Sequence, residues 1–194
     1  MSRRPWLLFC MLAALLAFGG CSRKDPEAEA AAAAPKRKPS VEIVASEAKG
    51  FSVGSMIAAN PIYVFFDPQC PHCGRLWQAS VPLQNKARFV WIPVSLLNAS
   101  SGPQGAALLA SSDPAKSMNE HEASMLANGG GISAANVAPD MLEAVKKNTA
   151  LFNNLGIEGV PFLIARNART GTTVTRGGEM STEALAELVG VVPP

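Results

Sequence analysis

Two cysteines lie three residues apart in the segment Cys70-Pro71-His72-Cys73. Thiol–disulfide exchange needs one sulfur that is a thiolate at working pH and a second that resolves the mixed disulfide. In a Cys-x-x-Cys pair at a helix start, the first cysteine's pKa can fall from about 8.5 to roughly 3.5–7.5. The spacing also places both sulfurs on one helix face. The pair predicts a thiol:disulfide oxidoreductase, with Cys70 exposed and attacking and Cys73 more buried.

The two residues between the cysteines tune the pair. Pro71 suits the first position of a helix and stiffens the turn. His72 can add a positive charge or an N–H donor near the Cys70 sulfur. Both effects stabilise the reduced form, which makes the disulfide a stronger oxidant. We therefore expect an oxidising couple.

Two other uses of the pair remain open. A structural disulfide is compatible with an exported protein, although a bridge across so short a loop restricts the unfolded chain little. A metal site could join the pair to the two histidines, His72 and His121. A single Cys-x-x-Cys, however, lacks the second ligand pair of a zinc site. We expect no metal or other cofactor, and we expect His121 to be a helix-surface or half-buried histidine.

A second candidate site is the segment Gly159-Val160-Pro161-Phe162. A proline that opens an apolar strand after a glycine-containing turn is consistent with a cis peptide bond, and a trans proline at a strand start is the alternative. In a thioredoxin-like architecture such a proline lies beside the disulfide. We therefore expect Val160 and Pro161 to bind substrate through the backbone.

The elements that position these residues follow from the hydrophobic pattern. Residues 62–66 are an apolar, β-branched and aromatic run, typical of a strand buried on both faces. A turn at Asp67-Pro68 ends this strand. A helix should begin near Pro71 and continue to a kink or end at Pro82.

The rest of the globular part also alternates strands and helices. Strands are expected at residues 41–44, 51–53, 89–94, 162–165 and 172–176. Helices are expected at residues 104–110, 114–127 and 139–155, and from Ser181 onward. This order suits the α/β class and predicts a thioredoxin-like fold with an inserted helical region.

The N-terminal residues 1–20 predict a signal peptide, because two arginines precede a short apolar stretch that contains Cys10 and ends in two glycines. Cys21 follows at once, as in the cleavage box of bacterial lipoproteins, which it resembles. In that class of protein the new N-terminal cysteine carries a lipid. We expect lipidation of Cys21, with ordinary signal cleavage nearby as the alternative.

Residues 21–39 predict a lipidated N-terminus and an Ala/Pro-rich tether, because prolines interrupt an alanine run that has no apolar face. Residues 40–194 have the length of a single domain. Loss of residues 1–20 removes two arginines, so 17 basic residues become 15, against 15 acidic ones. The mature chain is near neutral and has no basic stripe interleaved with aromatics, so nucleic acid is not an expected partner.

Residues 63–73, Tyr-Val-Phe-Phe-Asp-Pro-Gln-Cys-Pro-His-Cys, resemble the active-site strand and loop of the periplasmic DsbC/DsbG branch of the thioredoxin superfamily, most closely DsbG. Residues 109–116 and 122–124 resemble its inserted helical region, and residues 154–161 its approach to the cis-proline. The resemblance covers about residues 61–189. It implies disulfide interchange with cysteine-containing exported proteins and a membrane redox partner.

Three features differ from that branch. The N-terminal dimerisation domain and linker helix have no room here, so we expect a monomer. Val160 precedes the proline where the branch usually has threonine. The dipeptide Pro71-His72 is that of the oxidase DsbA. The last two differences favour dithiol oxidation.

These patterns together predict a periplasmic oxidoreductase that a lipid anchors to the membrane. Ser22 after the lipidated cysteine favours the outer over the inner membrane. One alternative keeps the enzyme class but reverses electron flow, giving a disulfide reductase or isomerase. The other is a non-enzymatic, thioredoxin-like subunit of an envelope assembly.

Overall fold

The computed structural model describes residues 36–193. The predicted signal peptide, Cys10, Cys21 and most of the predicted tether lie outside these residues. Among the residues described, no helix is both long and apolar enough to cross a membrane.

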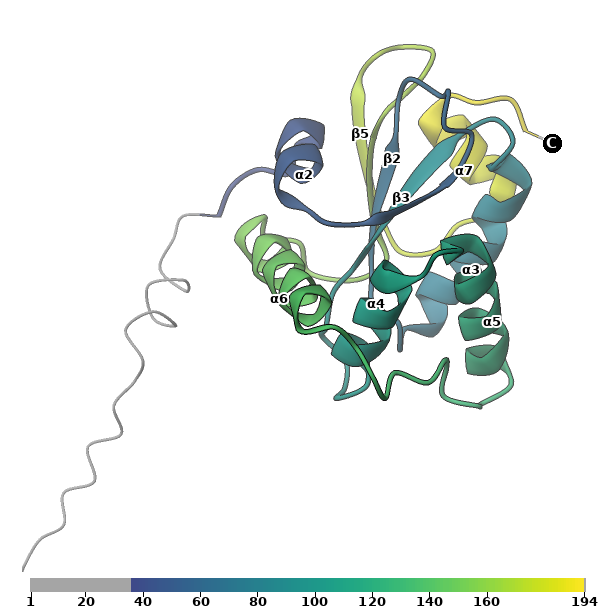
Figure 1. Ribbon diagram of the computed structural model, residues 1–194. Coiled ribbons are helices and arrows are strands. Elements are labelled where there is room, and N and C mark those ends of the chain that lie inside the picture. Colours follow the sequence, from purple (N-terminus) through teal and green to yellow (C-terminus); the bar gives the residue numbers. More distant parts are fainter. Residues whose placement is uncertain (1–35, 194) are drawn as a thin grey trace, which may run out of the picture. The chain divides into compact units, whose positions relative to one another are not determined.

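Five strands form one sheet in the order β1-β3-β2-β4-β5 (Figure 1). The central strands β2 and β3 are parallel, and every other neighbouring pair is antiparallel. The strands are β1 Phe51–Gly54, β2 Ile62–Phe66, β3 Arg88–Pro93, β4 Phe162–Arg166 and β5 Thr173–Gly177. The helices are α2 Val41–Glu47, α3 Pro71–Ser80, α4 Ser101–Ala110, α5 Pro114–Leu126, α6 Pro139–Asn154 and α7 Thr182–Val189, and a 3₁₀ turn, η1 Val81–Leu83, follows α3.

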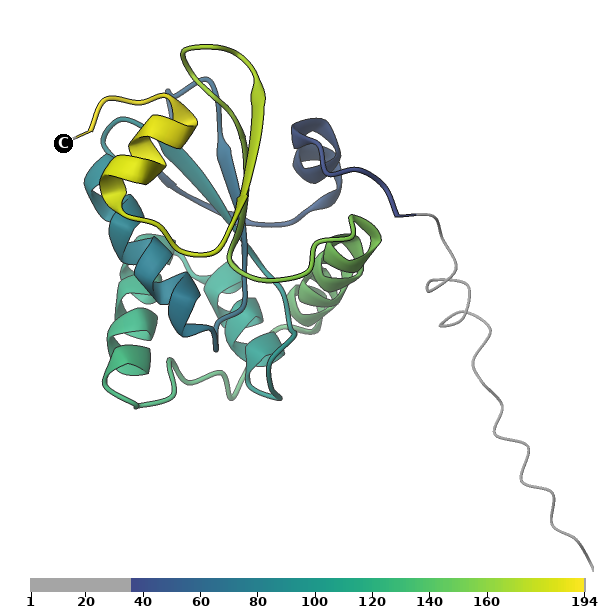
Figure 2. The same ribbon diagram turned by 180° about the vertical axis from the view of Figure 1, so that it is seen from behind.

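Side chains of β2 alternate between two apolar cores, one on each face of the sheet. Val64 and Phe66 pack in the first core, which α3 and α7 cover. Phe65 packs in the second core, where it meets Phe152 of α6 and Val44 of α2. Figures 1 and 2 show these helix pairs on opposite faces. The predicted α/β fold with inserted helices is confirmed, since α4 and α5 follow β3 before the chain reaches α6 and β4.

Trp77 fixes helix α3 against both the sheet and the inserted helices. The Trp77 ring lies edge-on to that of Trp91, with 5.2 Å between centroids. Its indole N–H donates a hydrogen bond of 2.8 Å to Asn119 Oδ1 of α5. Burial of two large aromatic rings stabilises this contact, so the helix that carries the cysteine pair has a defined position.

One element prediction is wrong: residues 41–44 form the start of α2, not a strand. Ser40 caps this helix, because its side chain accepts a hydrogen bond of 3.2 Å from the Ile43 N–H. The branched side chains of this segment suggested a strand, but the cap and the burial of Val44 against the sheet favour a helix. The helix expected at residues 104–110 also begins earlier, at Ser101.

The last residues of the predicted tether contact the domain. The Arg37 backbone N–H donates a hydrogen bond of 2.8 Å to Asn154 O at the end of α6. Its guanidinium pairs with Glu47 of α2 at 2.7 Å. The chain therefore meets the second-core face of the sheet before α2 begins.

Candidate active site

Buried Asp67 holds the turn between β2 and α3. Its Oδ1 accepts a hydrogen bond from the Gln69 N–H (2.8 Å), and its Oδ2 accepts from the Leu96 and Leu97 N–H groups (2.7 and 3.0 Å). Its backbone carbonyl accepts from the Cys70 N–H at 3.0 Å. A buried carboxylate needs such partners, because an unpaired charge in the interior is costly. The turn thus holds Cys70 in a defined place at the start of α3.

Cys70 is the N-cap residue of α3, and Cys73 lies one turn further on, its N–H 3.0 Å from Cys70 O. Cys70 is 5% exposed and Cys73 is fully buried. The prediction of an exposed Cys70 is therefore wrong, although the order of burial is as expected. The Val160 carbonyl oxygen lies 3.7 Å from the Cys70 Sγ and covers it.

The pKa of Cys70 is lowered to about 6. The largest cause is a hydrogen bond from the Cys73 thiol, followed by the backbone N–H groups of Cys73 and His72 and by the His72 charge, while burial opposes them. These backbone groups lie in the first helical turn, where N–H groups point toward the helix start and the helix dipole also favours an anion. Cys70 is therefore mostly a thiolate at neutral pH.

The pKa of Cys73 is raised far above its usual value. Burial is the largest cause, and its hydrogen bond to Cys70, the Cys70 charge and the Glu122 charge add to it. Desolvation disfavours the charged form of a buried thiol. The pKa values of the two thiols thus differ in the direction expected when Cys70 is the nucleophile and Cys73 is the resolving thiol.

Glu122 of α5 is a site residue that sequence reasoning missed. It is 3% exposed, and its Oε1 has no hydrogen-bond partner. Its Oε2 fills the space beside Gly74, where a Cβ on that residue would overlap the carboxylate. Burial, and then the charge of Cys70, raise the pKa of Glu122 to about 8. The one signal in the sequence is Gly74 itself, since a glycine inside a helix lowers stability and needs a reason.

Glu122 also lines a pocket of about 410 Å³ between α3 and α5, together with Trp77, Asn119 and Leu126. The carboxyl group thus lies between the buried side of α3 and a space that water can enter.

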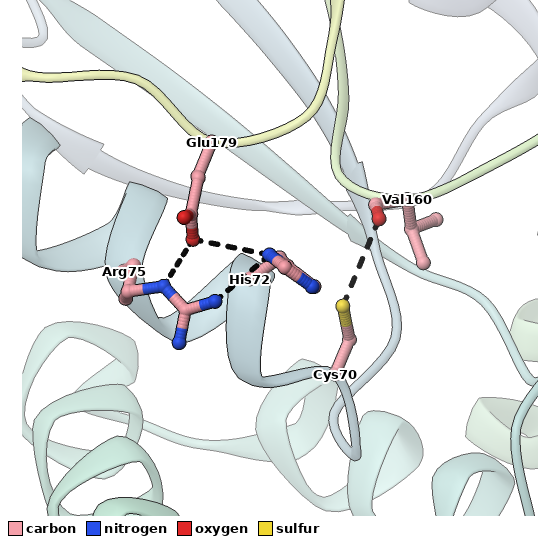
Figure 3. A network of polar contacts seen from close by, with 5 residues as sticks. All are labelled: Cys70, His72, Arg75, Val160 and Glu179. Atoms are coloured by element: carbon pink, nitrogen blue, oxygen red, sulfur yellow. Dashed lines mark hydrogen bonds and ion pairs between the residues drawn. The ribbon is translucent and has the colours of Figure 1, made fainter.

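His72 and Pro71 lie on the exposed side of the helix start. The Nδ1 of His72 is 3.2 Å from Glu179 Oε2 and 2.8 Å from an Arg75 guanidinium nitrogen (Figure 3). Arg75 Nε in turn pairs with the same Glu179 oxygen. Glu179 and Arg75 were not singled out from the sequence, because exposed charges on a loop and a helix carry no distinctive pattern.

The structure brings Val160 and Pro161 beside the cysteine pair, as expected from the sequence. The peptide bond between them is cis, the first of the two alternatives that the sequence left open. The Pro161 carbonyl accepts a hydrogen bond of 2.9 Å from the Gly178 N–H. A pocket of about 400 Å³ adjoins this segment, lined by Leu155, Ile157 and Phe162 among others.

The prediction for His121 is wrong, because the side chain is fully buried rather than on the surface. Its Nε2 donates to the Pro68 carbonyl at 2.7 Å, and its Nδ1 accepts from the Ile132 N–H at 3.2 Å. Burial lowers its pKa. Because Nδ1 accepts from a backbone N–H, the ring proton is on Nε2, and both nitrogens are satisfied. His121 therefore holds the loop before Cys70. Within residues 36–193 no group of His, Cys, Asp and Glu side chains could hold a metal ion.

Residues 59–192 match the family described as thioredoxin-like domain. The chain is 30% identical over 143 residues to the thiol:disulfide interchange protein DsbG of Pseudomonas aeruginosa, covering 71% of this chain and 54% of that protein. It is 34% identical over 105 residues to DsbG of Escherichia coli, covering 52% of this chain and 41% of that protein. The chain thus spans about half the length of these relatives, or less.

Solved structures show the same fold. A compact conformation of Proteus mirabilis ScsC superposes with a TM-score of 0.66 at 18% identity, over 84% of this chain and 85% of that one. At this identity the likeness concerns the fold alone.

Proposed function

Because the chain belongs to the family of thioredoxin-like domains, and within that superfamily to the DsbC/DsbG type, we propose that it exchanges disulfides with exported proteins as an oxidant. The proposal rests on one observation: two cysteines that lie three residues apart have pKa values shifted in opposite directions. Cys70 has its pKa lowered to about 6, whereas burial raises that of Cys73.

In the oxidising direction, a substrate thiolate attacks the Cys70 sulfur of the Cys70–Cys73 disulfide. The bond between the two protein sulfurs breaks, and Cys73 leaves with the electron pair and takes up a proton. A second substrate thiolate then attacks the substrate sulfur of the mixed disulfide, and Cys70 leaves as a thiolate. The substrate gains one disulfide, and the protein becomes a dithiol. A thiol with a low pKa is a good leaving group, which favours this direction.

Glu122 supplies the proton that Cys73 takes up. A carboxyl group with a pKa of about 8 is largely protonated at neutral pH. It lies beside Gly74, the residue after Cys73. Return of the pair to the disulfide form releases the proton along the same path, toward the pocket between α3 and α5.

Val160 and Pro161 position the substrate chain next to Cys70. The Val160 carbonyl lies 3.7 Å from the Cys70 sulfur, at the entrance to the pair. An extended substrate segment could pair with this backbone as an added strand does. Its cysteine would then meet Cys70.

The protein works in the periplasm, on a lipid anchor at Cys21, and a membrane redox partner reoxidises it. The location and the anchor rest on residues 1–39 of the sequence, with their signal-like and tether-like composition. A redox partner is needed because each exchange leaves the protein as a dithiol. Incorporation of a radiolabelled fatty acid into the mature chain, lost in Cys21→Ser, is the expected result. A labelled Cys21→Ser chain or an unlabelled native chain would contradict the anchor.

Trapping of substrates tests the exchange function. The Cys73→Ala variant, expressed in its native cell, should accumulate mixed disulfides between Cys70 and exported proteins, because no Cys73 thiol remains to attack the Cys70 sulfur and release the bound chain. The control Cys70→Ser/Cys73→Ala should trap none. Equal amounts of disulfide-linked species in both variants, or none in either, would contradict the proposal.

The resting state of the pair tests the direction. Thiol alkylation of whole cells followed by a gel shift should find Cys70 and Cys73 mostly as the disulfide. A pair that rests as the dithiol would indicate a reductase or an isomerase instead.

A further inference from the structure

Three charged or titratable side chains meet beside Cys70 on the exposed side of α3 (Figure 3). His72 and Arg75 are one helical turn apart on α3, and Glu179 lies on the loop between β5 and α7. One carboxylate oxygen, Glu179 Oε2, contacts both His72 Nδ1 and Arg75 Nε. All three side chains are between 38% and 60% exposed, so the cluster is a surface feature at the rim of the site.

The sheet and the cis-proline segment fix the loop that carries Glu179. Gly177, the last residue of β5, is in register with Phe162 of β4. The next residue, Gly178, donates its N–H to the Pro161 carbonyl at 2.9 Å. Glu179 follows directly. Its carboxylate is therefore tied to the same backbone segment that covers the Cys70 sulfur.

The three side chains restrain one another. The His72 Nδ1 lies 2.8 Å from an Arg75 guanidinium nitrogen and 3.2 Å from Glu179 Oε2. A carboxylate can only accept a hydrogen bond, so in the protonated ring Nδ1–H donates to Glu179. Figure 3 shows Nε2 turned away from Glu179 and toward the Cys70 side of the cluster. The Arg75–Glu179 pair thus orients the ring.

We propose that Glu179 is a positioning residue that limits the oxidising strength of the Cys70–Cys73 pair. It holds Arg75 and His72 and offsets their positive charge beside Cys70. The inference rests on the proposed exchange function and assigns a role to a residue outside the Cys-x-x-Cys segment.

The physical reason is the balance of charge around the Cys70 thiolate. The His72 charge already contributes to lowering the pKa of Cys70, and Arg75 lies on the same helix face. A carboxylate next to these cations reduces the positive potential that the thiolate experiences. Loss of the carboxylate charge should therefore stabilise the reduced protein relative to its disulfide.

The test is the equilibrium between the purified full-length mature protein and a glutathione redox buffer at pH 7. Glu179→Gln keeps the shape and an oxygen that accepts the Arg75 hydrogen bond, but removes the charge. Its equilibrium constant for reduction of the protein disulfide should rise about two- to fivefold, the size expected for an exposed charge pair. This increase should disappear near 1 M salt, where the screening length is about 3 Å.

Two variants serve as controls. Glu183→Gln removes a carboxylate four residues further on, in the first turn of α7, which contacts neither His72 nor Arg75. Its equilibrium constant should equal that of the native protein, and so should that of Glu179→Asp, which keeps the charge. If the role of Glu179 were purely structural, Glu179→Gln would change the thermal stability but would not show the salt-dependent rise in the equilibrium constant.

An unchanged or lower equilibrium constant for Glu179→Gln overturns the inference while the exchange function stands. A native protein whose pair does not exchange with glutathione overturns the proposed function, and this inference with it. A matching increase in Glu183→Gln would mean that any nearby carboxylate acts in the same way, and would also overturn the specific role of Glu179.

Discussion

The two sides of the start of α3 provide opposite environments for chemically identical groups. On the outer side, Cys70 accepts a hydrogen bond from the Cys73 thiol and meets helix N–H donors and the His72 charge, and its pKa falls to about 6. On the inner side, Cys73 meets apolar residues and the carboxyl group of Glu122, and its pKa rises. The sulfurs are one helical turn apart. The position of each sulfur relative to the helix therefore decides which cysteine attacks.

The strongest consequence is a difference in reactivity between the two thiols. In the reduced protein at pH 7, iodoacetamide should modify Cys70 at least about a thousandfold faster than Cys73, because the thiolate is the nucleophile and Cys73 is both protonated and buried. Site-resolved mass spectrometry of a time course measures both rates. Cys70→Ser should leave Cys73 unmodified, and rapid labelling of Cys73 in that variant would contradict the difference between the two sides.

Glu122 should make the stability of the reduced protein depend on pH. Its pKa is raised from an ordinary carboxyl value to about 8, so between about pH 4.5 and pH 8 the Glu122 carboxyl is protonated in the folded state and charged in the unfolded state. The contribution of Glu122 to stability then falls as pH rises through this window. The lowered pKa of Cys70 contributes with the opposite sign, but the native protein and the Glu122 variant share that contribution. Relative to the native protein, Glu122→Gln should gain roughly 2–4 kcal/mol in unfolding free energy between pH 5 and pH 8.5.

Urea denaturation at a series of pH values measures this gain. Glu120→Gln is a matched control, since Glu120 lies on the same helix with an exposed side chain. Parallel stability curves for Glu122→Gln and the native protein would show that Glu122 titrates as an ordinary surface carboxyl group.

The inner side should also be intolerant of added volume. Gly74→Ala places a methyl group where the Glu122 carboxylate lies, and overpacking of this kind costs about 1–3 kcal/mol. Gly177→Ala, where no atom lies within 4 Å of the added Cβ, should change the unfolding free energy by less than about 1 kcal/mol. Equal melting temperatures for the two variants would mean that Glu122 does not occupy this space.

The sequence predicted most of the fold because its strands and helices have strong local patterns. The strand expected at residues 62–66, the helix expected at residues 139–155 and the helix expected from Ser181 onward each correspond to an observed element. The error at residues 41–44 arose where two local signals compete. Branched residues favour a strand, whereas Ser40 caps a helix.

The site was predictable only as far as it is local in sequence. The pair of cysteines and the cis bond before Pro161 have signatures of a few residues each. Tertiary packing brings Glu122 and Glu179 to the site. In the sequence they lie 49 and 106 positions after Cys73, respectively. Neither has a local pattern that distinguishes it from the other glutamates of the chain, and the burial of His121 was missed because it too depends on tertiary packing.

The most direct test of the account is a titration of the Cys70 thiol. Absorbance of the reduced protein at about 240 nm reports thiolate formation, and Cys70→Ser provides the baseline to subtract. The account predicts one transition with a midpoint near pH 6. A midpoint at about 8.5, the value of an ordinary cysteine, would contradict the claim that the start of α3 stabilises the Cys70 anion.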